Sequence, residues 1–416
     1  MVQWPGRLRG ILRPHGKIET GDVSAVEKSI VALVPCSAYD EEQVYQAVAQ
    51  GISLLGSLEK WISREEKILL KPNMLGKAVP QRAVTTHPAV FKAVARLLKE
   101  SGFAHVSYGD SPSVTAPSPQ SVAEGCLIAQ AAREMELPLA DFQHGRQVSF
   151  PQGKACKSFH IANGALEADA LINLCKMKTH ALERLTGAVK NTYGCIPGVN
   201  KGTGHARYPD AVRFARMLAD LSSLLKPRLH IMDGIVAMEG NGPSSGTPIA
   251  MNVLLFSIDP VALDSVFCHL VHLSPASLPT CIAGEQAGIG HWREEEIEVR
   301  TPEGILPIRE VQARYGNPRF NVHRGDVSKG LIGRALRLIP GLQDKPVADP
   351  ALCIRCGDCV KSCPVEGKAL ALDKTKDRAP RYDYSKCIRC YCCQEVCPAK
   401  AISVSGPLSR KKAGKA

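Results

Sequence analysis

The chain has 416 residues, 44% of them hydrophobic and 22% charged, as expected for an ordinary folded protein of two or three domains. No apolar run approaches the ~20 residues of a membrane helix, and the N-terminal region lacks the apolar stretch and cleavage site of a secretory signal. The formal net charge is +12, but the lysines and arginines are spread along the chain without aromatic–basic interleaving. We therefore expect no membrane span and no nucleic-acid partner, and we expect acidic partners or anionic ligands instead.

Composition and motifs divide the chain into five expected segments. They are an N-terminal arm (1–23), an α/β domain (24–318), a basic connector (319–347), a small α+β ferredoxin-like domain (348–405) and a basic tail (406–416). The connector contains SKGLIGRALRLI, a candidate basic amphipathic helix. Because this segment lies between two folded units, a packed connector is favoured over a helix on a membrane surface.

Expected strands alternate with expected helices through the first large domain. The strands are EKILLKPN, HVSYGDSPSV, ADALINLCKMKTH, RLHIMDGIVAMEGNGP and VLLFSIDP; the helices are 86–102, 118–136, 208–224 and the segment after Asp259. The first helix has Thr86 or His87 as its cap and Pro88 in its first turn. A further helix is expected to begin in LTGAVKNTYG. This alternation predicts an α/β fold with a mostly parallel sheet.

The five expected strands all end in polar residues. These are Lys71 and Asn73; Asp110 and Ser111; Lys176, Lys178 and His180; Asp233; and Asp259. Ligands of open α/β sheets bind outside the carboxyl ends of the strands, so we expect these residues to converge on one crevice. Each position alone has a structural explanation, because Asp-Pro and Gly-Asp are common turn signals. Together, at corresponding strand ends, they favour a functional site.

The residue types at these positions indicate an anion-binding site. The candidate catalytic residues are Lys71, Asp110, Lys178, His180, Lys190 and Asp233. The lysines favour a substrate that carries a carboxylate or phosphate, and a helix N-terminus near Thr186-Gly187 could add backbone N–H groups that donate to this anion. The aspartates, with His87, His180 and His205, could act as acids and bases or bind a metal.

Two histidines and two cysteines are weaker candidates for the site, and three common cofactor or nucleophile motifs are absent from the sequence. His269 and His272 are expected to be packed or surface residues, and Cys175 a core residue; Cys195 follows a glycine in a loop and could be a reactive thiol. The chain has no Gly-x-Gly-x-x-Gly after a strand, no P-loop and no Gly-x-Ser-x-Gly. Nicotinamide chemistry and nucleotide hydrolysis are therefore disfavoured, whereas a further metal or a flavin stays open.

Several segments between about residues 30 and 275 resemble the domain-of-unknown-function family 362. They are LLKPNML, GDSP, INLCKMKTHALERLTGAVKNTYGCIPG, MDGIVAMEGNGPSSGTP and IDPVALDSV. The resemblance implies an iron–sulfur centre protein with a dicluster ferredoxin module at one end. It implies no particular reaction.

Nine of the sixteen cysteines lie in residues 353–397, mostly in two near-copies of C-x2-C-x2-C-x3-C-P. This is the bacterial run for 4Fe-4S clusters, in which the fourth cysteine ligates the other cluster. We therefore expect two 4Fe-4S clusters, one held by Cys353, Cys356, Cys359 and Cys397 and the other by Cys387, Cys390, Cys393 and Cys363. The segment resembles the dicluster ferredoxin fold, with AISVSG as its closing strand.

Zinc is the alternative for these cysteines, but zinc sites use two CxxC pairs separated by a longer loop. Cys392, beside Cys393, is expected to be a non-ligand thiol, although it leaves a second register open. Ligand thiols must stay reduced, so a cytoplasmic location is expected.

Three functions fit these observations. The first is a redox enzyme in which a donor such as a flavodoxin or a reductase supplies electrons, and the clusters pass them to an anionic substrate or cofactor in the α/β crevice. The second is a non-catalytic electron carrier or scaffold subunit of a larger redox complex. The third is an iron–sulfur or metal-handling protein. A convergent lysine-rich site favours the first, because a docking surface needs none.

Overall fold

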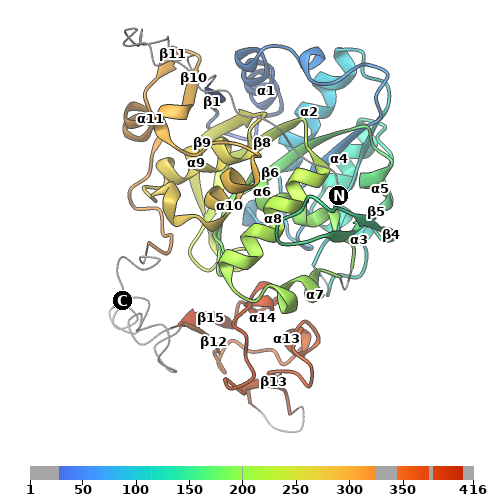
Figure 1. Ribbon diagram of the computed structural model, residues 1–416, viewed down its shortest axis with the longest axis vertical. Helices are drawn as coiled ribbons and strands as arrows, with labels where there is room; N and C mark the ends of the chain where they lie inside the picture. The colour runs from blue at the N-terminus through green and yellow to red at the C-terminus, as the bar shows by residue number, and fades with distance from the viewer. Residues whose placement is uncertain (1–27, 114, 199, 325–343, 374–377, 406–416) are drawn as a thin grey trace, which may run out of the picture.

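A nine-stranded mixed sheet forms the centre of the large domain (Figure 1). The structure is a computed structural model that describes residues 28–113, 115–198, 200–324, 344–373 and 378–405. The strands are β1 (Ser29–Pro35), β2 (Ile68–Pro72), β3 (Val106–Tyr108), β6 (Ala170–His180), β7 (Arg184–Thr186), β8 (Leu229–Glu239), β9 (Thr247–Ser257), β10 (Ile297–Thr301) and β11 (Gly304–Leu306).

The strand order is β11-β10-β1-β9-β8-β6-β2-β3, and β7 pairs with β6. The pairing registers show that β3, β2, β6, β8, β1 and β10 run in one direction, whereas β7, β9 and β11 run against them. The expected α/β domain with a mostly parallel sheet is thus confirmed. The carboxyl ends of the six codirectional strands lie at one edge, as such folds require for a ligand site.

Helices cover both faces of this sheet. They are α1 (Glu41–Leu55), α2 (Pro88–Glu100), α3 (Pro119–Gly125), α4 (Ile128–Glu134), α5 (Asn163–Leu166), α6 (Ala188–Asn191), α7 (Asn200–Arg207), α8 (Ala211–Leu225), α9 (Pro260–Leu270), α10 (Pro279–Ala287) and α11 (Ile308–Tyr315). Two separate clusters of buried apolar side chains result, one with α6, α8, α9 and α11, the other with α1 to α4. A hairpin of β4 (Gly145–Ser149) and β5 (Ser158–Ala162) completes the domain. No helix of the described residues is long and apolar enough to cross a membrane.

The structure differs from the expected elements at two places. The helix expected over 118–136 is two short helices, because Leu127 adopts a left-handed conformation (φ 63°) between them. Asp233, expected near a strand end, lies within β8, which continues to Glu239, whereas Lys176, Lys178 and His180 lie in the last part of β6, as expected. His87 is the N-cap of α2, its Nδ1 accepting from the Ala89 N–H.

The small domain lies at one end of the molecule, with α14 turned toward the α/β domain (Figure 1). Its elements are β12 (Lys345–Ala348), α13 (Asp358–Lys361), β13 (Leu370–Ala371), β14 (Arg381–Tyr382), α14 (Cys392–Glu395) and β15 (Ile402–Ser405). The two cysteine motifs fold alike: Arg355 and Arg389 both have positive φ, 58° and 57°, and each motif leads into a one-turn helix. The expected closing strand is β15, which pairs with β12. The expected N-terminal arm, most of the connector including its candidate helix, and the basic tail lie outside the described residues.

Candidate active site between the two domains

A cavity of about 80 Å³ lies where the carboxyl ends of the parallel strands meet the ferredoxin-like domain. The α/β domain contributes Lys71, Asn73, Asp110, Ser111, Lys190, Asn191, Tyr193, Gly194, Lys201 and His205 to its wall. The opposite wall comes from the small domain, as Ser362, Cys392, Glu395 and Val396. Neither domain alone encloses this space.

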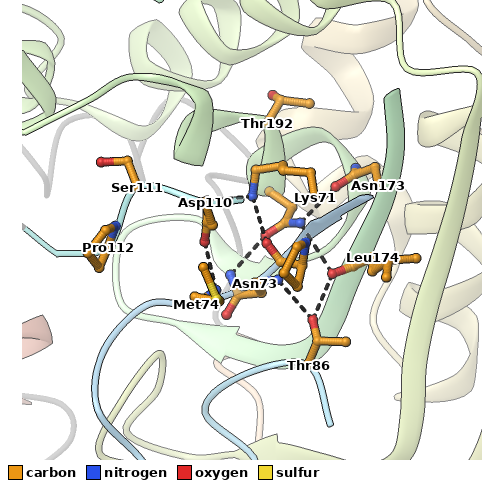
Figure 2. Close-up of polar contacts among 12 residues, drawn as sticks. Lys71, Asn73, Met74, Thr86, Asp110, Ser111, Pro112, Asn173, Leu174 and Thr192 are labelled. Carbon is orange, nitrogen blue, oxygen red and sulfur yellow. Dashed lines mark hydrogen bonds and ion pairs between the residues drawn. The ribbon is translucent and has the colours of Figure 1, made fainter. Parts of the chain in front are cut away.

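Lys71 and Asp110 form a buried ion pair at the edge of the cavity (Figure 2). Lys71 lies at the end of β2 and Asp110 just after β3, and Lys71 Nζ is 2.8 Å from Asp110 Oδ1. The other carboxylate oxygen accepts from the Met74 N–H at 2.6 Å. Gly194 closes over the pair so tightly that a Cβ there would lie 1.8 Å from Asp110 Oδ1. The glycine of the KNTYG element is therefore required by the close approach of this carboxylate.

Lys178 is a fully buried amine held by neutral acceptors. Its Nζ donates to Asn73 Oδ1 at 2.8 Å and to the Val84 carbonyl at 2.7 Å. Asn73 is oriented in turn by Asn191 Oδ1, which accepts from its amide at 2.8 Å. Burial, followed by the nearby charge of Lys190, lowers the pKa of Lys178 to about 7. This amine is thus poised to gain or lose a proton near neutrality.

His180 connects the two domains. Its Nδ1 accepts from the backbone N–H groups of Leu182 and Glu183, both at 3.1 Å, and its Nε2 lies 2.7 Å from Glu395 Oε1. With Nδ1 an acceptor, the proton of the neutral ring is on Nε2, facing the carboxylate. Burial lowers the pKa of His180 to about 4, so the ring is neutral. Burial raises the pKa of Glu395, but His180 and Lys190 outweigh it and hold that pKa below its usual range.

Asp233 belongs to a second buried network beside the cavity. Its carboxylate accepts from Lys176 Nζ (2.7 Å), the Tyr39 hydroxyl (2.8 Å) and the His87 N–H (2.9 Å). The Tyr39 and His87 rings stack at 3.5 Å. Every oxygen of Asp233 is occupied, and the residue does not line the cavity. Its place in the structure is that of a support for Lys176.

Three cationic or polar groups face the cavity with few partners. Lys190 is half-buried and lines the wall; Lys201 donates to the Ser111 and Pro112 carbonyls; His205 is buried with Nδ1 unpaired. Burial lowers the pKa of Lys201 to about 8 and that of His205 to about 4. Among the groups that line the cavity, the three lysines at positions 71, 190 and 201 exceed the two carboxylates at 110 and 395 by one positive charge when all are ionised.

Two residues expected in the crevice have other positions. Asp259 follows β9, which runs against its neighbours, so it lies at the opposite edge of the sheet. There its carboxylate caps α9 and accepts from the Ser29 hydroxyl. The helix N-terminus after Gly187 offers no free donors, because the Asp264 carboxylate already accepts from Ala188 N and Val189 N. The protein's own anion fills that position.

The cysteines near the site are core residues, and the possible metal ligands lie elsewhere. Cys175 is buried in the core, as expected, and Cys195 is also fully buried. Burial raises the pKa of the Cys195 thiol to about 12, so it is an inert core residue and the hypothesis of a reactive loop thiol is wrong. Within the described residues, the His, Cys, Asp and Glu side chains that cluster tightly enough for a single metal ion are Glu285, His291 and Glu296, away from this cavity.

The cysteines of the small domain fall into two sets. Cys353, Cys356, Cys359 and Cys397 line one small cavity, which contains a residue from each motif. Cys363, Cys390 and Cys393 are buried and Cys387 is half-buried. Cys392 turns toward the interdomain cavity instead. The group around the small cavity, with thiols from both motifs, fits the donor chemistry of a 4Fe-4S site.

The comparisons with known proteins agree with this architecture. Residues 68–269 match a domain of unknown function, DUF362, and residues 345–398 match a 4Fe-4S dicluster domain. A thylakoid-associated protein from Synechocystis is 33% identical over 302 residues, which cover 70% of this chain and 91% of that protein. The chain belongs to the DUF362 family.

Two solved structures are similar to part of this chain at low scores. They are the lactate racemase apoprotein from Thermoanaerobacterium thermosaccharolyticum (TM-score 0.39, 12% identity, 58% of this chain) and a protein from Thermotoga maritima (TM-score 0.34, 11% identity, 59% of this chain). The chain spans less than two thirds of either, 56% and 59% of their lengths.

The glycine-rich loop of the DUF362 domain holds the ferredoxin-like domain in place. Gln394, fully buried on α14, donates to the Asn241 carbonyl, the Asn241 side chain and the Gly242 carbonyl at 2.9 to 3.1 Å. Ser244 donates to the Glu395 carbonyl at 2.6 Å. A Cβ on Gly242 would lie 2.2 Å from the Thr179 carbonyl, so the loop lies directly on the KTH segment of β6.

Sequence reasoning missed Tyr39, Glu183, Lys201, Glu395 and Gln394. Tyr39 follows the apolar run IVALV, so the strand-end rule applied to that run would have found it. Lys201 lies in a glycine-rich segment with no pattern of its own, and Glu395 is a spacer residue inside a cysteine motif. No periodicity could show that either one faces the other domain.

Proposed function

We propose that this DUF362 protein is an iron–sulfur oxidoreductase that reduces a small anionic substrate in the cavity between its two domains. In this proposal Cys353, Cys356, Cys359 and Cys397 hold one 4Fe-4S cluster, and Cys387, Cys390, Cys393 and Cys363 hold a second. One observation carries the proposal: α14, which bears Cys393, forms a wall of the same cavity that Lys71, Lys190 and Lys201 line. A carrier or scaffold has no need of such a shared cavity.

Charge and size define the substrate class. The one excess positive charge of the wall, from three lysines against two carboxylates, favours a carboxylate or another oxyanion. A cavity of about 80 Å³ accommodates a small molecule, whereas a flavin would require the domains to separate. Two clusters, each releasing one electron, would supply the pair needed for a two-electron reduction.

Lys190 and Lys71 would bind the anion, with Asp110 fixing the position of Lys71. Lys201 would donate a proton, because the lowered pKa of about 8 brings its ammonium within range of transfer at neutral pH. Lys178 and His180 would support this wall, through Asn73 and Glu395. Asp233 would hold Lys176 and contribute to the shape of the site without touching the substrate.

The test starts from anaerobic protein with its iron and sulfide measured and its clusters reduced by dithionite, the excess then removed. A panel of small carboxylates and oxyanions, including pyruvate, fumarate, sulfate and nitrite, is added, and the return of cluster absorbance is recorded. We expect at least one anion to reoxidise the clusters in the unchanged protein and at least tenfold more slowly in Lys190→Ala. Lys60→Ala, at an exposed lysine away from the cavity, is the control.

Equal rates of cluster reoxidation in Lys190→Ala and in the control would show that electrons do not pass to the anion in this cavity. If no anion of the panel reoxidises the clusters and none binds by calorimetry, the non-catalytic carrier or scaffold becomes the better function. Zinc in place of iron and sulfide would remove the electron-transfer proposal altogether.

A further inference from the structure

The two cysteine motifs are near-copies in sequence but differ in exposure. In CIRC at 353–356, Ile354 is 64% exposed and Cys356 is exposed. In CIRC at 387–390, the equivalent Ile388 is half-buried and Cys390 is 8% exposed. The same local sequence thus faces solvent in one motif and the protein interior in the other. Two chemically equivalent cluster sites therefore have different access to an external molecule.

An apolar patch adjoins the exposed cysteine set. Leu352 is 52% exposed and precedes Cys353, and Ile354 follows it. Large exposed apolar side chains are ordinary when scattered, but here two of them flank one thiol of the small cavity that Cys353, Cys356, Cys359 and Cys397 line. Redox partners bind through small interfaces of this kind, with an apolar centre next to the redox group.

Exposed cations surround this patch. Arg355 lines the cysteine cavity, and Arg381 and Lys400 directly adjoin residues that line it. Two acids also adjoin lining residues: Asp358, which lies 3.7 Å from Lys361, and the exposed Asp373. The three cations outnumber these two acids, so the rim carries an excess of positive charge that suits an acidic partner.

We infer that the face formed by Leu352, Ile354, Arg355, Arg381 and Lys400 is the docking site of a small acidic one-electron carrier protein. This inference rests on the proposed function and specifies the order in which its two clusters would transfer an electron. A cluster held by the exposed cysteine set would accept one electron from the carrier, which is thereby oxidised. The electron would then reach a cluster held by the inner set, whose Cys393 adjoins the cavity-lining Cys392. The external carrier and the substrate would thus approach through different cysteine sets of the small domain.

The experiment uses a reduced acidic flavodoxin as the probe and the full-length iron–sulfur protein as acceptor. Stopped-flow absorbance gives the second-order rate of cluster reduction at several salt concentrations. We expect Ile354→Glu to lower this rate by about tenfold or more, because it places an anion against an acidic partner, and reduction by dithionite to be unchanged. Ile305→Glu is the matched control: Ile305 is 63% exposed on β11, at the opposite end of the molecule (Figure 1).

Lys400→Glu is a second variant, independent of the cluster motif's apolar positions. We expect a slower flavodoxin reaction whose rate falls less steeply with salt, since one attractive charge is gone. Unchanged flavodoxin rates in both variants, with iron and sulfide intact, would overturn the docking site. The same conclusion follows if Ile305→Glu slows the reaction equally. Because no substrate is added, these results do not depend on the interdomain cavity, which the Lys190→Ala experiment tests separately.

Discussion

Replacing Asp233 by Asn should strongly destabilise the α/β domain. The side chains of Lys176 and Asp233 are 1% and 0% exposed, and Asp233 accepts three hydrogen bonds. An amide nitrogen cannot accept, so at least one donor loses its partner, and Lys176 keeps a buried charge without a counter-charge. Breaking a buried pair in this way costs about 3–5 kcal/mol, against a total of about 5–15 kcal/mol for a typical domain.

The free energy of unfolding is measured by urea denaturation followed by tryptophan fluorescence. Trp61 and Trp292 both lie in the α/β domain, and cluster absorbance follows the small domain separately. The double variant Lys176→Met, Asp233→Asn is the control, since it removes the charge together with its partner and should lose much less stability. A loss below about 1 kcal/mol in Asp233→Asn, or an equal loss in the double variant, would refute the reasoning.

The pH dependence gives a second check on the same pair. Burial already lowers the pKa of Lys176 despite Asp233, and without the carboxylate it should fall further. The folded variant then binds fewer protons than the unfolded chain below the unfolded lysine pKa of about 10.4, so its stability rises with pH in that range. Asp233→Asn should therefore recover stability between pH 7 and about 10.

Three further predictions concern neighbouring residues. Burial raises the pKa of Glu183 to about 8, so the folded chain holds a proton that the unfolded chain has lost, and the free energy of unfolding falls as pH rises from about 4.3 to 8. Glu183→Gln should abolish this pH dependence in urea titrations, and at pH 8.5 the variant should be more stable than the unchanged protein. Cys392→Ala should retain full iron and sulfide, whereas Cys393→Ala should lose about one cluster's worth; iron loss in Cys392→Ala would indicate the alternative register. Gln394→Ala removes three hydrogen bonds to the 241–242 loop and should increase the radius of gyration in small-angle scattering; an unchanged radius would mean that other contacts suffice.

The sequence was informative about the sheet because apolar strands followed by polar residues have a local signature. Lys71 and Asp110 were found in this way, and both line the cavity. The same rule failed at Asp259, because strand direction depends on tertiary pairing and β9 runs against its neighbours. The alternation of Lys176, Lys178 and His180 is a strand period, and the expected strand ADALINLCKMKTH matches β6.

The other half of the site could not be predicted in this way. Glu395 and Cys392 lie inside a cysteine motif whose spacing is explained entirely by cluster ligation. Their contribution to the cavity depends on how the small domain packs against the Asn241–Gly242 loop, which leaves no local pattern. Sequence periodicity describes elements, whereas a cavity between domains is a property of their relative placement.

The hydrogen bonds between Gln394 and the Asn241–Gly242 loop also constrain how such chains can diverge. A ferredoxin domain that has cluster ligands but no counterpart of Gln394 or Glu395 would leave the loop carbonyls without this donor and His180 Nε2 without its carboxylate. The loop and the second cysteine motif are therefore expected to covary, as two parts of one heritable unit.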